Sequence, residues 1–91
     1  MTGQSETSAQ TIHLGRLAWM CRRGLKELDV LIQPFFQNVY PGLDGNLQQS
    51  FVSLLQEEDA DLLDWLVHEH PAPERYGPLL EQLLAFRSAV D

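Results

Sequence analysis

This chain has little cysteine, little positive charge and no long apolar run, and each shortage excludes a class of protein. Its single cysteine, Cys21, cannot form an intramolecular disulfide, which favours a reducing, intracellular compartment. Six basic residues against thirteen acidic ones give a net charge of −7. This balance argues against nucleic acid as the partner, because phosphate binding needs a broad positive surface. No window approaches the roughly eighteen apolar residues of a membrane span, so we expect no direct membrane insertion.

The N-terminal end is polar and carries no targeting signal. Residues 1–11 contain no Lys or Arg and no apolar run, so they fit neither a secretory signal nor a transit peptide. We therefore expect the protein in the cytoplasm. Residues 1–10 are rich in Ser, Thr and Gln, and they predict a disordered tail ahead of a single domain over residues 11–88.

Apolar residues recur at steps of three and four along most of the remaining chain, as in amphipathic helices. The pattern predicts helices over residues 12–23, 25–40 and 45–56, a fourth that begins within the acidic run at 57–61, and a fifth that begins near Pro78. No stretch shows the alternation of a half-buried strand. The sequence therefore predicts an all-α fold, a compact single-domain bundle of about five helices.

Three residues are expected to shape the helix ends and bends. Pro34 falls inside the second helix, where it removes a backbone hydrogen bond, so we expect a kink or a break with Gln33 capping a second segment. Asp44 is a suitable N-cap for the third helix, and Asp59 for the fourth.

Residues with catalytic or metal-binding chemistry are scarce. The acidic run at 57–61 lacks the glycine and the ligand spacing of a calcium loop, and His68 and His70 have no third ligand nearby in sequence. Cys21 lies on an apolar stripe, which favours an inert buried thiol over a nucleophile. Glu27 has no activated partner close in sequence. We therefore expect a small interaction module with no catalytic residue and no metal site, not an enzyme.

Positive charge is concentrated at one place. Four of the six basic residues lie between positions 16 and 26: Arg16, Arg22, Arg23 and Lys26. Gly24 falls inside this cluster and marks the corner between the first two helices. The cluster has a structural interpretation, in which cations end one helix, Gly24 terminates it, and Glu27 and Asp29 begin the next. Lys26 lies on the unfavourable side of the helix dipole, however, and this favours a docking surface for an acidic partner.

Trp19 precedes the cluster and lies away from the centre of the apolar stripe of the first helix. Two interpretations stay open at this point. The side chain either completes the core, as most tryptophans do, or forms an exposed surface beside the basic cluster.

Two segments resemble a known family. The run from Trp19 to Asp29, with Arg23, Gly24 and Glu27 in an Arg-Gly-x-x-Glu arrangement, is similar to the signature of the FAD assembly factors of succinate dehydrogenase. A second segment, Asp-x-Asp-Leu-x-x-Trp-Leu over residues 59–66, resembles a later motif of the same family. The resemblance runs from about residue 13 to residue 87. The chain departs from the family at Leu25, where Met is common, and at Ala60, where Pro is common.

The resemblance implies a five-helix chaperone that binds the flavoprotein subunit of succinate dehydrogenase, and in bacteria often that of fumarate reductase. Such a factor promotes self-catalysed attachment of FAD to its client, so FAD is the client's cofactor and none is expected to bind tightly here. The client-binding residues would be Arg23, Gly24 and Glu27, together with Arg16, Trp19, Arg22, Lys26 and Asp29.

In this interpretation Arg23 pairs with a client carboxylate or polar group, and Glu27 receives a client cation or orients Arg23. An Arg23→Glu protein should then stay folded but lose its client. The free protein is expected to be a monomer. The alternative function is a generic helical adaptor or an antitoxin-like interaction module, which needs the basic cluster but no flavoprotein.

Overall fold

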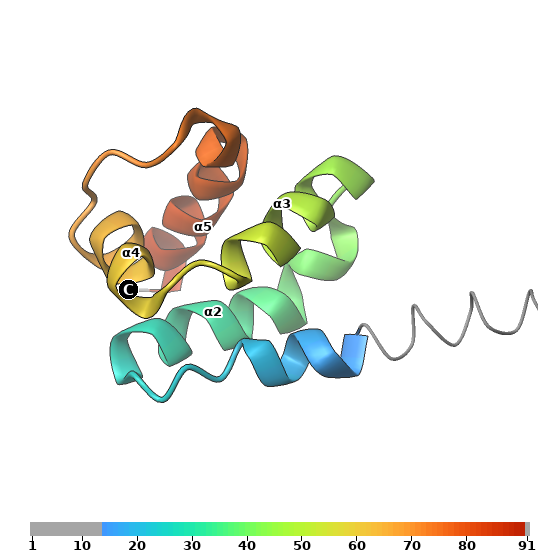
Figure 1. Ribbon diagram of the computed structural model, residues 1–91. Helices are drawn as coiled ribbons and strands as arrows, with labels where there is room; N and C mark the ends of the chain where they lie inside the picture. The colour runs from blue at the N-terminus through green and yellow to red at the C-terminus, as the bar shows by residue number, and fades with distance from the viewer. Residues whose placement is uncertain (1–13, 91) are drawn as a thin grey trace, which may run out of the picture.

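The chain folds into five α-helices joined by short turns, as the computed structural model describes it over residues 14–90 (Figure 1). Residues 14–20 form a first helical segment, followed by α2 (Lys26–Asn38), α3 (Gly45–Leu55), α4 (Asp59–Leu62) and α5 (Gly77–Val90). Two 3₁₀ turns, Tyr40–Gly42 and Glu74–Tyr76, precede α3 and α5. Residues 14–90 contain no strand, so the predicted all-α class is confirmed. The tail predicted for residues 1–10 lies outside the described residues.

The first helical segment ends earlier than the sequence pattern indicated. It stops at Met20 instead of Arg23. The amide of Arg22 donates to the Trp19 carbonyl at 3.0 Å, which tightens the last turn, and the amide of Arg23 leaves the helix for the side chain of Asp29. Competition from a side-chain acceptor therefore ends this helix before its apolar stripe does.

Helix α2 continues through Pro34 as one element, so the expected break at Gln33 does not occur. The carbonyl that loses its bond belongs to Val30, whose side chain is 57% exposed. A carbonyl on the solvent side of a helix can bond to water, which lowers the cost of an internal proline. The Pro34 carbonyl itself accepts a bond from the side-chain amide of Asn38 at 2.9 Å.

Helix α3 begins where the sequence predicted. The carboxylate of Asp44 accepts a hydrogen bond from the Leu47 amide at 2.9 Å and caps the helix. The predicted cap of α4 is wrong, because Glu58 occupies the N-cap position without a side-chain bond and Asp59 is the first helical residue. Helix α4 then widens into a π-helical turn, Leu63–Val67. A positive φ of 56° at Glu69 follows it.

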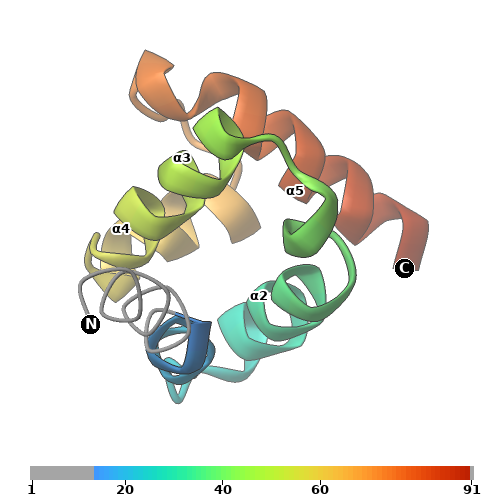
Figure 2. The same cartoon turned by 90° about the vertical axis from the view of Figure 1, so that its right-hand side faces the viewer.

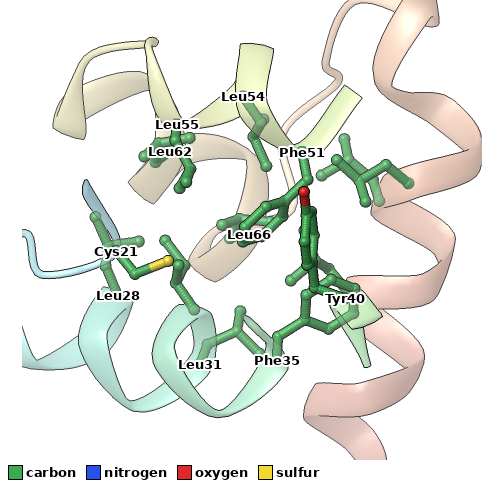
Figure 3. Close-up of a cluster of buried hydrophobic side chains, with 14 of the residues drawn as sticks. Cys21, Leu28, Leu31, Phe35, Tyr40, Phe51, Leu54, Leu55, Leu62 and Leu66 are labelled. Atoms are coloured by element: carbon green, nitrogen blue, oxygen red, sulfur yellow. The ribbon is translucent and has the colours of Figure 1, made fainter. Parts of the chain in front are cut away.

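The core lies where α2, α3, α4 and α5 face one another (Figures 2 and 3). Helix α2 packs against the π-helical turn and α5, and α3 packs against α5. An aromatic cluster fills the centre: the Phe35 and Phe51 rings lie 5.7 Å apart, and Tyr40 lies 5.2 Å from Phe51. Cys21 and Leu28 extend the buried surface toward the corner between the first two helices (Figure 3). That corner is consequently fixed to the core by apolar contacts on its inner side.

The Asp44 cap predicts a measurable loss of stability on its removal. Asp44→Ala should lower the free energy of unfolding by about 1 kcal/mol, because the Leu47 amide loses its acceptor. Urea unfolding followed by circular dichroism measures the change. Asn46→Ala is the control, since Asn46 is exposed in the same turn. Equal urea midpoints for Asp44→Ala and the wild type would contradict the assignment.

Candidate docking site

Residues 14–20 and α2 lie side by side and run in opposite directions, joined by a corner at residues 21–25 (Figures 1 and 2). We call these two helices and their corner the N-terminal hairpin. Gly24 adopts a φ of +82°, the left-handed region that side chains disfavour. A Cβ atom at Gly24 would meet no atom of this chain within 4 Å. The glycine is therefore required by backbone conformation, and the space above it is open.

The carboxylate of Asp29 holds the corner in this conformation. It accepts hydrogen bonds from the amides of Arg23 at 2.7 Å and Gly24 at 3.2 Å. Asp29 is half-buried and lies in the first turn of α2, where a negative charge is also favoured by the helix dipole. Its oxygens bind the chain's own backbone, so the structure gives Asp29 a role inside the corner.

Arg23 connects the corner to the start of α4. Its side chain is only 14% exposed, and its Nε lies 2.8 Å from the Asp59 carboxylate. Its Nη1 donates to the carbonyls of Met20 at 3.0 Å and Leu55 at 2.8 Å, and its Nη2 donates to the Glu57 carbonyl at 2.9 Å. Three of these four hydrogen bonds tie the end of the first helical segment to the end of α3, the start of α4 and the link between them.

This network changes the role expected for Arg23. A guanidinium that already binds one carboxylate and three carbonyls is not free to pair with a client carboxylate. Glutamate at this position would face Asp59 and three carbonyl oxygens, so the structure predicts that Arg23→Glu destabilises the fold, against the expectation from the sequence that it stays folded. The structural interpretation of the motif therefore applies to Arg23 and Asp29. Arg23 binds residues far away in the sequence, and Asp29 binds the backbone of the corner.

Other residues of the candidate site lie on the outer surface of the N-terminal hairpin. Trp19 is 70% exposed, so the interpretation that it completes the core is wrong. Leu17 and Cys21 are buried, and a step of two residues along a helix turns a side chain by about 200°, away from them. The remaining exposed members are Arg16, Arg22, Gly24, Lys26 and Glu27.

The exposed cations of the candidate site differ from the other three basic residues. Arg23, Arg75 and Arg87 each form a salt bridge, at 2.8, 2.9 and 2.6 Å. Within residues 14–90, no such bridge is made by Arg16, Arg22 or Lys26, and all three lie in the N-terminal hairpin. Among residues 14–90, the Lys and Arg side chains without a salt bridge are therefore confined to the N-terminal hairpin of an acidic protein.

Cys21 and the acidic or histidine side chains offer little reactive chemistry. Burial raises the pKa of the Cys21 thiol to about 12, and the side chain is 1% exposed, in keeping with an inert thiol. The described part of the chain holds no group of three His, Cys, Asp or Glu side chains placed to bind a metal ion. None of its helices is long and apolar enough to cross a bilayer. The arrangement offers a surface that can bind a partner, and the thiol of Cys21 is buried beneath it.

The sequence did not reveal the hydrogen-bond partners that support the candidate docking site from the interior side. Nothing in a single sequence pairs Arg23 with Asp59, which lies 36 positions away. Glu57 was likewise treated only as part of an acidic run ahead of a helix, but its carboxylate accepts bonds from the Tyr76 hydroxyl at 2.6 Å and from Arg75 at 2.9 Å. These bonds, the tyrosine's above all, lower the pKa of Glu57. The useful signal was the resemblance of both segments to one family, since both belong to one network.

An exposed cationic hairpin on a small helical scaffold defines a protein-docking module. Comparison with known proteins identifies which kind. Residues 15–87 match the model of a family described as "Flavinator of succinate dehydrogenase". The chain belongs to this family.

Several curated relatives carry the name FAD assembly factor SdhE. The protein from Haemophilus ducreyi is 41% identical over 71 residues, which cover 77% of this chain and 87% of the relative. The Pseudomonas aeruginosa protein is 51% identical over 59 residues, covering 65% of this chain and 70% of the relative. The Yersinia pseudotuberculosis protein is 46% identical over 59 residues, covering 65% and 66%. The comparison confirms the expected family and the class of assembly factor rather than enzyme.

The network around Arg23 predicts a large stability difference between two neighbouring arginines. Arg23→Ala should lower the free energy of unfolding by about 2–3 kcal/mol, because three carbonyls and Asp59 lose a charged donor. Arg22→Ala, the matched control, should change it by less than about 0.5 kcal/mol, because Arg22 is exposed. Urea unfolding measures both. Similar midpoints for the two variants would show that the network contributes nothing.

The burial of Cys21 predicts a thiol that reacts only when the chain opens. In native protein at pH 8, Ellman's reagent should react far more slowly than with the urea-unfolded chain, because both access and thiolate formation are suppressed. Release of thionitrobenzoate measures the rate. A native rate equal to the unfolded one would place Cys21 at the surface.

Proposed function

We propose that this protein binds the flavoprotein subunit of succinate dehydrogenase, in the cytoplasm, and promotes the covalent attachment of FAD to a histidine of that subunit. The observation that carries the proposal is family membership together with the placement of the family motif. Residues 15–87 match the flavinator family, and Gly24 and Glu27 of the motif are exposed at the corner of the N-terminal hairpin.

The factor acts in this proposal by binding and not by chemistry. Its only thiol is buried with a raised pKa, and Glu27 is exposed with no activated partner close in sequence. The flavoprotein supplies the FAD, the histidine and the reaction. The factor stabilises a client conformation in which the reaction proceeds, so FAD remains the client's cofactor.

The residues of the docking site have separate roles in this proposal. Arg16, Arg22 and Lys26 provide available positive charge, Glu27 provides an exposed carboxylate, and Gly24 leaves open space for a client backbone. Arg23 and Asp29 hold this surface in place.

The proposed clients include the flavoprotein of fumarate reductase, whereas nucleic acid and the membrane interior are not proposed as partners. The free protein is a monomer in this proposal.

Glu27 is the member of the motif whose side chain is exposed for contact, so its charge should matter to the client and not to the fold. Glu27→Gln should reduce covalent flavin on the dehydrogenase subunit in cells that lack the wild-type gene, with little change in the stability of the factor. In-gel flavin fluorescence of the denatured subunit measures the product. Glu81→Gln is the matched control, because Glu81 is exposed on α5.

Deletion of the gene gives the test of the proposal as a whole. Flavin fluorescence of the subunit should fall in its absence and recover with the wild type. Equal fluorescence with and without the gene would remove the proposed function. Full recovery by Glu27→Gln, with recovery by the wild type, would remove only the role of Glu27. A generic adaptor would capture partners without flavin when purified from cell extract.

A further inference from the structure

Trp19 is exposed although its helix is well packed. The side chain is 70% exposed, while Leu17 and Cys21, two residues to either side, are 2% and 1% exposed. Leaving so large an apolar surface in water is unfavourable, by roughly 25 cal/mol for each Å². The helix thus buries Leu17, and Cys21 is buried just after its end, while its largest side chain points outward, where it adds little to the packing of the bundle.

The surroundings of Trp19 provide a complete contact surface. The ring borders a shallow cleft of about 450 Å³ between the first helical segment and α3, lined also by Arg16, Met20, Val52 and Gln56. The guanidinium carbon of Arg22 lies 5.7 Å from the ring centroid, in range of a cation–π contact. An aromatic face, an apolar cleft and two flanking cations therefore lie together.

The flanking charge indicates the chemistry of the partner. Arg16 and Arg22 form no salt bridge among residues 14–90, and both are exposed. A complementary surface offers an apolar recess for the indole ring with carboxylates at its rim. A bilayer surface fits less well, because a helix at an interface needs a continuous apolar face, and here Leu17 and Cys21 are already packed in the core.

We infer that Trp19 is the anchor of the client interface, inserted in an apolar recess of the flavoprotein subunit with Arg16 and Arg22 facing client carboxylates around it. The inference rests on the proposed function and adds the residue that supplies most of the affinity. Buried tryptophans and arginines near the centre of an interface commonly dominate binding, whereas surrounding contacts mainly exclude water.

Affinity for the purified flavoprotein subunit gives the first test, by isothermal titration calorimetry. Trp19→Ala should weaken binding by at least about 30-fold, as expected for a tryptophan that dominates an interface. Trp19→Phe should recover part of the affinity. Leu14→Ala is the control, because Leu14 is 50% exposed on the same helical segment, and it should change affinity by less than about threefold. Thermal unfolding should leave Trp19→Ala as stable as the wild type.

A spectroscopic readout separates contact from indirect effects. The chain has two tryptophans, Trp19 and Trp65, so 5-fluorotryptophan labelling gives two ¹⁹F resonances, and Trp65→Phe assigns them. Saturation with the flavoprotein should shift and broaden the Trp19 resonance and leave that of Trp65, which packs against the core, nearly unchanged.

The outcomes distinguish the inference from the proposed function. If the wild type does not bind the flavoprotein, the proposed function fails and the inference fails with it. If the wild type binds but Trp19→Ala binds equally well, or the Trp19 resonance does not move in the saturated complex, only the anchor is overturned. Binding to anionic lipid vesicles that requires Trp19, with flavoprotein affinity unaffected by Trp19→Ala, would also overturn it in favour of a membrane surface.

Discussion

The position of the docking surface depends on the guanidinium of Arg23. Its nitrogens donate to carbonyls at the last residue of the first helical segment, Met20, and at the last residue of α3, Leu55. The last carbonyls of a helix have no hydrogen-bond donor within it and carry the negative end of its dipole, so the half-buried guanidinium of Arg23 supplies both a donor and a positive charge. A fork of N–H groups reaches several acceptors together, and a lysine ammonium on a flexible stem does not.

This arrangement divides the family motif between two physical roles. Arg23 and Asp29 face inward and fix the corner through the backbone, whereas Gly24 and Glu27 are exposed on it. A corner that is already ordered loses little conformational freedom when a partner binds, so more of the contact energy appears as affinity. In the proposed function, Arg23 and Asp29 therefore support binding without contact, and their loss would reduce function through the shape of the surface.

Sequence periodicity predicted the helices because local spacing determines which face of each segment is apolar. Residue type predicted the Asp44 cap of α3, because the hydrogen bond from the Leu47 amide spans only three residues. Periodicity did not determine the environment of Trp19, since a position beside an apolar stripe faces either a neighbour or water, depending on how the helices pack. The Arg23–Asp59 pair joins residues far apart in sequence, and no local rule predicts it. The clustering of basic residues selected the candidate site, but it did not separate the cations that form salt bridges from those that do not.

The separation of salt-bridged cations from available ones makes the electrostatic potential uneven over the surface of the molecule. Arg75 and Arg87 are neutralised locally by Glu57 and Glu69, so their charges contribute little to the field at a distance. Within residues 14–90, the basic residues without a salt bridge all lie in the N-terminal hairpin of a protein whose net charge is −7. An acidic client surface is repelled by most of the molecule and attracted at one corner. Electrostatics of this kind favours encounters in the productive orientation, and the final affinity then depends on apolar contact there.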